Sequence, residues 1–177
     1  DGGAVFTNND SLADKIRMIA NHGQSKKYIH DRIGVNSRLD SIQAAILRVK
    51  LKELDDFSSR RQKVALVYDE ELSNTDGIMI PNKEKYTNHV YHQYTLLLEG
   101  VDRDGLVNYL AAQKIPSMIY YPVPGHRQKM FGLSGNTLPV LPVTDWLTER
   151  VVSLPIHTEL DQEQLSAITK AVLDFVG

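Results

Sequence analysis

The longest uninterrupted helical pattern in this sequence follows Gly34 and continues almost to Gly77. No glycine or proline, the two residues that most often interrupt a helix, occurs between these positions. Apolar residues recur there at helical spacing. Ser37 followed by Asp40 predicts a capping box at the start. About 36 residues in one helix would span roughly 54 Å. We therefore expect this helix to bridge two packed units or to kink.

The two halves of this predicted helix differ in how their apolar residues are distributed. The first four turns are apolar on most sides, with only Ser41, Arg48 and Lys50 clearly polar. The second half has a narrower apolar stripe. An exposed apolar patch of several hundred Å² usually marks an interface, so we expect the protein to form a homodimer. The alternative is a long amphipathic helix within one core.

Composition limits the classes of protein to which the chain can belong. Its 177 residues suffice for one domain, or for a small domain and part of another. Twenty basic and 22 acidic side chains create no field that favours nucleic acid or an anionic membrane. The absence of cysteine excludes disulfides and thiolate chemistry. It also fits a reducing compartment, so we expect a cytoplasmic protein. No apolar run approaches the ~18 residues that span a bilayer.

Strands and helices alternate along the rest of the chain, which predicts the α/β fold class. The polar stretch 74–88 is the only plausible internal boundary. We expect strands at 4–7, 91–98, 117–121 and 151–154, helices at 10–22, 103–114, 143–150 and 161–176, and loops at 24–33 and 125–139.

Asn36 and Arg38 form the most informative polar cluster, because they precede the long helix. A helix N-terminus carries unpaired N–H groups and attracts phosphate. An amide donor and a guanidinium beside it strengthen that tendency. The alternative is a capping and surface role. His22 comes beside Gly23 at the end of a predicted helix, where a cation interacts favourably with the helix dipole.

Other polar and aromatic residues point less clearly to chemistry. Tyr120 and Tyr121 are adjacent in a predicted strand, so we expect them to point to opposite faces. His89 and His92 also fall on opposite faces of a strand-like run, and we predict no metal site there. No glycine-rich phosphate loop, zincin motif or nucleophile elbow is present.

Five motifs follow one another along essentially the whole chain. They are Asp1-Gly-Gly-Ala-Val-Phe-Thr7, Asn21-His-Gly23, Gly34-Val-Asn-Ser-Arg-Leu-Asp40 with Gln43-Ala-Ala45, Tyr120-Tyr-Pro-Val-Pro124, and Ser153-Leu-Pro-Ile-His157 with Asp161-Gln-Glu-Gln164. Together these motifs resemble those of the DegT/DnrJ/EryC1/StrS sugar aminotransferases.

The resemblance implies the C-terminal half of a fold type I transferase that depends on pyridoxal 5'-phosphate. Residues 1–37 would end the cofactor-binding large domain, residues 38–76 would form the long connecting helix, and residues 77–177 would form a small α/β domain. The reaction implied is transfer of an amino group, usually from glutamate, to a nucleotide-linked keto-sugar. The family's Schiff-base lysine would lie upstream of residue 1. We therefore expect no catalytic lysine in this chain and no activity from this chain alone.

The resemblance also assigns site residues. Asn36 matches the position that reaches across the dimer to the cofactor phosphate. Positions near the sugar-nucleotide site are matched by Arg38, Tyr120, Tyr121, His22 and His126. Gly125 departs from the leucine that the family commonly has before this histidine. Two alternatives remain open, namely a sugar dehydratase of the same fold, in which the lysine is replaced, and a non-catalytic regulatory or interaction module.

Overall fold

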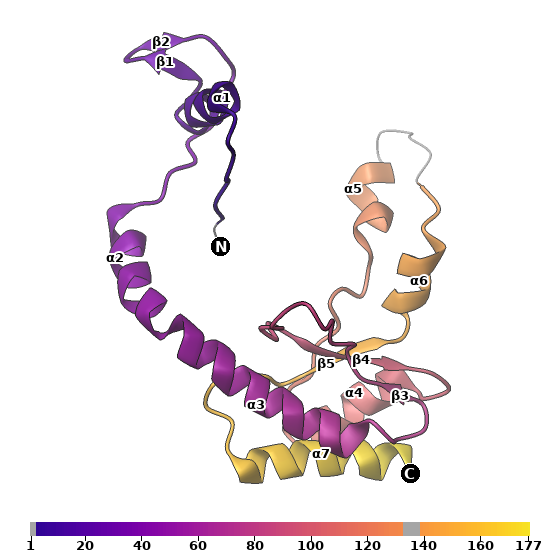
Figure 1. Cartoon of the computed structure of the whole chain (residues 1–177). Helices are drawn as coiled ribbons and strands as arrows, with labels where there is room; N and C mark the ends of the chain where they lie inside the picture. Colours follow the sequence, from indigo (N-terminus) through magenta and orange to yellow (C-terminus); the bar gives the residue numbers. More distant parts are fainter. Residues whose placement is uncertain (1–2, 133–138) are drawn as a thin grey trace. The chain divides into compact units, whose positions relative to one another are not determined.

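The structure is a computed structural model that describes residues 3–132 and 139–177. Contacts divide the chain into two compact units, Asp1–Leu54 (unit 1) and Asp55–Gly177 (unit 2). Figure 1 follows their elements along the chain. This division falls inside the predicted long helix, whereas the resemblance implied boundaries after residues 37 and 76. Asp1 and Gly2 of the first family motif and part of the predicted loop 125–139 lie outside the described residues.

Unit 1 begins with an extended segment and helix α1 (Asp10–Ala20), which Asn9 caps by accepting a hydrogen bond from the Leu12 N–H at 3.0 Å. The strand predicted at 4–7 is wrong, because this segment pairs with no other strand in the described part of the chain. The loop predicted at 24–33 is also wrong in part. It contains a short antiparallel hairpin of β1 (Gln24–Lys26) and β2 (Ile29–His30).

The predicted long helix is divided by one tighter turn. It consists of α2 (Ser41–Lys50), a 3₁₀ turn η1 (Leu51–Glu53) and α3 (Leu54–Leu72). Asp40 rather than Ser37 caps α2, because its carboxylate accepts a hydrogen bond from the Gln43 N–H at 2.8 Å. The Ser37 N–H instead donates to the Ala20 carbonyl at 2.9 Å. This bond holds Ser37 outside the helix, so the N-cap lies three residues later than the predicted one.

Unit 2 contains a three-stranded antiparallel sheet in the order β3-β4-β5. The strands are β3 (Ile78–Met79), β4 (Tyr94–Leu98) and β5 (Val151–Leu154). In β4 the alternate residues Tyr94, Leu96 and Leu98 are buried, which is the pattern of a strand with one face on a core. Strand β5 agrees with its prediction, whereas β4 covers only the second half of the predicted 91–98.

The three helices predicted in unit 2 begin within one residue of their predicted starts. The predicted strand 117–121 is wrong, since Met118 alone pairs with Ser153 in an isolated bridge. Pro116 and Pro122 flank this segment and cannot donate ladder hydrogen bonds. The remaining elements are α4 (Arg103–Ala112), η2 (Gly125–Arg127), α5 (Lys129–Gly132), α6 (Pro142–Thr148) and α7 (Gln162–Val176).

The apolar core belongs to unit 2 and explains why this unit is compact. It collects buried side chains from α3, α4 and α7 and from all three strands. Tyr68 of α3 and Tyr94 of β4 lie at its centre, with ring centroids 4.9 Å apart. Helix α4 packs against both α7 and strand β5 (Figure 1). The mixed helices and strands confirm the predicted α/β class.

Unit 1 differs, because Gly23 is its only buried residue among residues 3–54. Large apolar side chains are exposed on α2 and on the segments around it, including Phe6, Ile33, Ile42 and Val49. None of the helices that the structure describes is long and apolar enough to cross a membrane.

Candidate functional site

Backbone hydrogen bonds fix the segment that carries Asn36. Asn21, at the end of α1, pairs with Asn36 in an isolated antiparallel bridge. On either side of the bridge, the His22 N–H donates to the Val35 carbonyl and the Ser37 N–H donates to the Ala20 carbonyl, both at 2.9 Å. The position of Asn36 therefore depends on the end of α1 as well as on the start of α2.

Two glycines allow the chain to cross itself at this point. A Cβ added to Gly34 would lie 2.1 Å from the backbone nitrogen of Gly23, and one added to Gly23 would lie 1.8 Å from the Arg32 carbonyl oxygen. Gly23 also has φ +75°, a conformation that favours glycine. Only glycine permits this close approach of two backbone segments. It places the backbone at His22 next to the segment that leads to Asn36.

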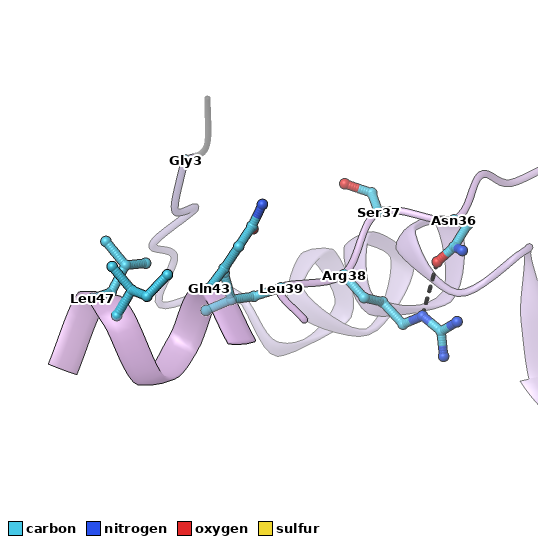
Figure 2. Close-up of a pocket in the computed structure, with 8 residues that line it drawn as sticks. Gly3, Asn36, Ser37, Arg38, Leu39, Gln43 and Leu47 are labelled. Carbon is cyan, nitrogen blue, oxygen red and sulfur yellow. Dashed lines mark hydrogen bonds between the residues drawn. The ribbon is translucent and has the colours of Figure 1, made fainter. Parts of the chain in front are cut away.

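Arg38 fixes the orientation of the Asn36 side chain. Its Nε–H donates to Asn36 Oδ1 at 2.9 Å, as the dashed line in Figure 2 shows. A guanidinium can only donate hydrogen bonds, so it must face the amide oxygen and not the amide nitrogen. Nδ2 of Asn36 is therefore turned away from Arg38 as a donor of two hydrogen bonds.

Asn36 and Arg38 line a pocket of about 840 Å³ that lies within unit 1 (Figure 2). Ser37 and Gln43 add polar groups to its wall, and Leu39 and Leu47 add apolar surface. The amide and guanidinium donors would suit an anionic group, while the leucines would suit the apolar face of a ring. The pocket therefore fits a ligand that combines an anion with a flat apolar part.

His22 does not line this pocket, and its backbone N–H bonds to Val35, the residue before Asn36. It has φ +59° and follows the C-cap of α1. Its carbonyl oxygen accepts a hydrogen bond from Nδ1 of His30 at 2.8 Å, which fixes a proton on that nitrogen because a carbonyl cannot donate. The structure thus brings Asn36 and Arg38 together at the pocket, whereas His22 approaches Asn36 only through its backbone.

The two predicted tyrosines lie in unit 2 and contact one another. Their ring centroids are 5.7 Å apart in an edge-to-face arrangement, so the prediction that they point to opposite faces is wrong. The reason is that this segment does not form a strand and has no regular alternation. Tyr121 is 70% exposed and Tyr120 is 39% exposed. The pair therefore presents aromatic surface to solvent.

His126 is held in a cluster that sequence reasoning missed. Its Nε2 lies 3.2 Å from Oδ1 of Asp145, and Arg127 contacts both oxygens of the same carboxylate. Hydrogen bonds from Arg127 lower the pKa of the Asp145 carboxyl below its ordinary value, with a smaller contribution from His126. Eighteen residues separate Arg127 from Asp145, and no periodic or motif signal connects them in the sequence. Only the three-dimensional contact identifies Asp145.

His89, one of the two histidines considered for a metal site, has other contacts. Nδ1 of His89 accepts a hydrogen bond from the Tyr91 N–H at 2.9 Å, and the two rings lie 4.3 Å apart. Within residues 3–132 and 139–177, no three His, Asp or Glu side chains gather as a metal site would require.

Fold and site together define a mixed α/β protein with a pocket at the start of a long helical stretch, lined in part by an amide and a guanidinium group. The chain belongs to the DegT/DnrJ/EryC1/StrS aminotransferase family, whose profile matches residues 1–173. This match confirms the family resemblance that the five motifs indicated.

Characterised relatives and a solved structure agree with this membership. A UDP-2-acetamido-2-deoxy-3-oxo-D-glucuronate aminotransferase from Pseudomonas aeruginosa is 42% identical over 97% of this chain and 46% of its own length. A UDP-N-acetyl-3-dehydro-alpha-D-glucosamine 3-aminotransferase from Acidithiobacillus ferrooxidans is 41% identical over 97% of this chain and 45% of its own length. The crystal structure of a family member from Brucella abortus aligns with a TM-score of 0.85 and 37% identity, over 97% of this chain and 45% of that chain.

This chain spans about half the length of the curated relatives it matches. The structural likeness confirms the predicted fold, the C-terminal half of a fold type I transferase.

Proposed function

We propose that this chain is part of a cytoplasmic aminotransferase that depends on pyridoxal 5'-phosphate. It would transfer an amino group from glutamate to a nucleotide-linked keto-sugar. Family membership and the printed activities of the two relatives support this proposal. The main structural support for this function is that Arg38 orients the side-chain amide of Asn36 in the pocket at the start of α2.

The residues at this pocket fit the phosphate of the cofactor. Asn36 Nδ2 can donate to a phosphate oxygen, because Arg38 already occupies the amide oxygen. The terminal nitrogens of Arg38 make no hydrogen bond with a residue that the structure describes, so they can neutralise negative charge. When bound, the pyridoxal ring supplies an electron sink. The role of these side chains is to hold its phosphate so that the ring stays oriented.

The remaining site residues would serve the sugar nucleotide. The family resemblance assigns this role to Arg38, His22, Tyr120, Tyr121 and His126. The exposed edge-to-face tyrosine pair offers a surface on which a sugar or base can pack. His126 offers a ring nitrogen for a hydroxyl group. The protein would act as a homodimer in which Asn36 reaches the cofactor of the partner subunit.

The lysine that binds the cofactor covalently would lie outside this chain, upstream of residue 1. A dehydratase of the same fold would lack this lysine, and a regulatory module would lack a cofactor site. The two relatives described above are named as aminotransferases, which favours the first reading over both alternatives.

Asn36 variants test the proposal in the full-length protein. Asn36→Ala removes one hydrogen bond to a charged group, which is worth about 1.5–3 kcal/mol, so cofactor affinity should fall by roughly 10- to 150-fold. Asn36→Asp should bind more weakly still, because it places a carboxylate against the phosphate. The measurement is spectroscopic titration with pyridoxal phosphate.

Two controls separate binding from folding. Asn8→Ala removes an exposed amide elsewhere in unit 1 and should leave cofactor affinity unchanged. Thermal melts of the cofactor-free proteins should agree within about 1 kcal/mol of stability. If both Asn36 variants bind the cofactor as wild type does, the assignment of Asn36 is wrong.

A further inference from the structure

Asp145 connects two separate elements through a bidentate contact. Arg127 of η2 donates from Nε to Oδ1 at 2.7 Å and from its NH2 nitrogen to Oδ2 at 2.6 Å. Two parallel hydrogen bonds fix the plane of the carboxylate. The carboxylate lies on α6, so this pair ties the turn after Pro124 to that helix. Oδ1 of the same carboxylate also lies close to a third side chain.

That third group is His126, whose side chain is only 8% exposed. Its Nε2 lies 3.2 Å from Asp145 Oδ1. Nε2 is buried and has no hydrogen-bond partner among the residues that the structure describes. The contact is therefore electrostatic. A lone pair on Nε2 would be repelled by the carboxylate oxygen, so the hydrogen of the neutral ring belongs on Nε2.

The other ring nitrogen is left as a hydrogen-bond acceptor. A neutral imidazole has one N–H donor and one acceptor nitrogen, and Asp145 assigns the donor to Nε2. Nδ1 makes no hydrogen bond with the described residues. A sugar carries hydroxyl groups, which can donate to such a nitrogen.

We propose that Asp145 is a positioning residue that orients His126 so that Nδ1 accepts a hydrogen bond from a hydroxyl of the bound nucleotide sugar. This inference rests on the proposed function, which supplies the ligand. Arg127 supports it by holding the carboxylate ionised and in place. An ion pair for stability alone would contribute little at this exposure, and it would not require a buried imidazole beside it.

The orientation of His126 can be tested in the 177-residue chain without any cofactor. Nitrogen-15 labelling of the histidine rings and long-range proton–nitrogen NMR at alkaline pH report which nitrogen carries hydrogen. We expect only the Nε2–H form in wild type and both forms in Asp145→Leu. Glu149→Gln, which removes a carboxylate paired with Arg150 at the end of the same helix, should match wild type. An Nδ1–H ring in wild type, or no change in Asp145→Leu, would overturn the proposal.

The role in binding is tested in the full-length protein with UDP-N-acetylglucosamine and with UDP as a probe that lacks the sugar. Asp145→Leu and His126→Phe should each weaken binding of the nucleotide sugar roughly tenfold and leave UDP affinity unchanged. The double variant should bind no more weakly than His126→Phe alone, because Asp145 acts through His126. Additive losses, or an equal loss of UDP affinity, would contradict the proposal.

Two measurements distinguish this inference from the function on which it rests. Pyridoxal phosphate titration and thermal melts of the same variants should match wild type, since Asp145 is assigned no contact with the cofactor. A wild type that binds neither pyridoxal phosphate nor UDP-N-acetylglucosamine contradicts the proposed function and removes the ligand assigned to His126. The NMR measurement decides the orientation of His126 independently of that outcome.

Discussion

Tyr94 shows how one buried hydroxyl couples the stability of unit 2 to pH. Its side chain is fully buried, and its hydroxyl donates to Oδ1 of Asp69 at 2.6 Å. Burial raises the pKa of Tyr94 well above its ordinary value, and the hydrogen bond to Asp69 raises it further. In the unfolded chain a tyrosine loses its proton near pH 10. In alkali the Tyr94 hydroxyl therefore keeps its proton in the folded state but loses it in the unfolded state.

Tyr94→Phe should lower the free energy of unfolding by about 1–3 kcal/mol at pH 8, because Asp69 loses a donor. The contribution of the native hydroxyl is fully present below about pH 10 and declines as pH rises above that value. The difference between wild type and variant should therefore shrink in alkali. Urea unfolding at pH 8 and pH 10.5 measures it. Tyr86→Phe, at a residue 87% exposed, is the control, and a difference that grows with pH would contradict the explanation.

At the scale of elements, helices and strands with strong local signals could be predicted. Strand β4 alternates buried and exposed residues, and α7 follows Asp161 with apolar residues at helical spacing. The hairpin β1–β2 could not be predicted, because its polar residues carry no alternation and its pairing depends on the crossing of Gly23 and Gly34. Strand β3 has only two residues. These elements exist because of contacts with distant segments.

The same distinction applies to the site. Asn36 and Arg38 could be found because a helix start has its own signal, although the capping residue is Asp40 and not Ser37. Asp145 could not be found, because its partners are fixed only when η2 and α6 meet. Local rules identified the groups near α2, and tertiary contacts identified the carboxylate beside His126.

The cap of α7 should contribute measurably to unit 2. The Asp161 carboxylate accepts from the Gln164 N–H at 2.8 Å, and Gln164 Oε1 accepts from the Asp161 N–H at 3.1 Å. Asp161→Ala should lower the free energy of unfolding by about 1 kcal/mol, since α7 buries Leu165 and Val172 in the core. Urea unfolding measures the loss. Ser166→Ala, on the exposed face of the same helix, should change it by less than about 0.5 kcal/mol, and equal effects would refute the role of the cap.

At the scale of the whole molecule, unit 1 exposes large apolar side chains to solvent. Ile33 is 98% exposed, Phe6 is 90% exposed, and Ile42 is 76% exposed. Side chains of this kind normally lie in a core or an interface. We therefore expect the 177-residue chain to self-associate and the full-length protein to be a homodimer.

Sedimentation at micromolar concentration tests this expectation. The isolated chain should form oligomers, whereas residues 55–177, which contain the core, should be monomeric. Replacing Ile42 and Val49 of α2 by Lys should reduce association without changing the melting of unit 2, since both side chains are exposed. A monomeric full-length protein would contradict the expected homodimer.

The chain alone should also fail to bind pyridoxal phosphate covalently at a defined position, because we propose that the lysine that binds the cofactor lies outside it. Borohydride reduction in the presence of the cofactor, followed by peptide mapping, should give only scattered and substoichiometric labelling of lysines. Stoichiometric labelling of one lysine, for example Lys50, would refute this assignment.

The β1–β2 hairpin lies between Gly23 and Gly34, whose backbones are in close contact, so its tip can carry an inserted group. Gly23 and Gly34 close the base of the loop, where an added methyl group would meet backbone atoms. The tip at Lys27 and Tyr28 is exposed. A peptide tag or fluorophore inserted between these two residues should leave the backbone of Asn36 in register, because the anchoring hydrogen bonds lie below it. The sequence of the tip is therefore free to diverge or lengthen, while the two glycines at its base are not.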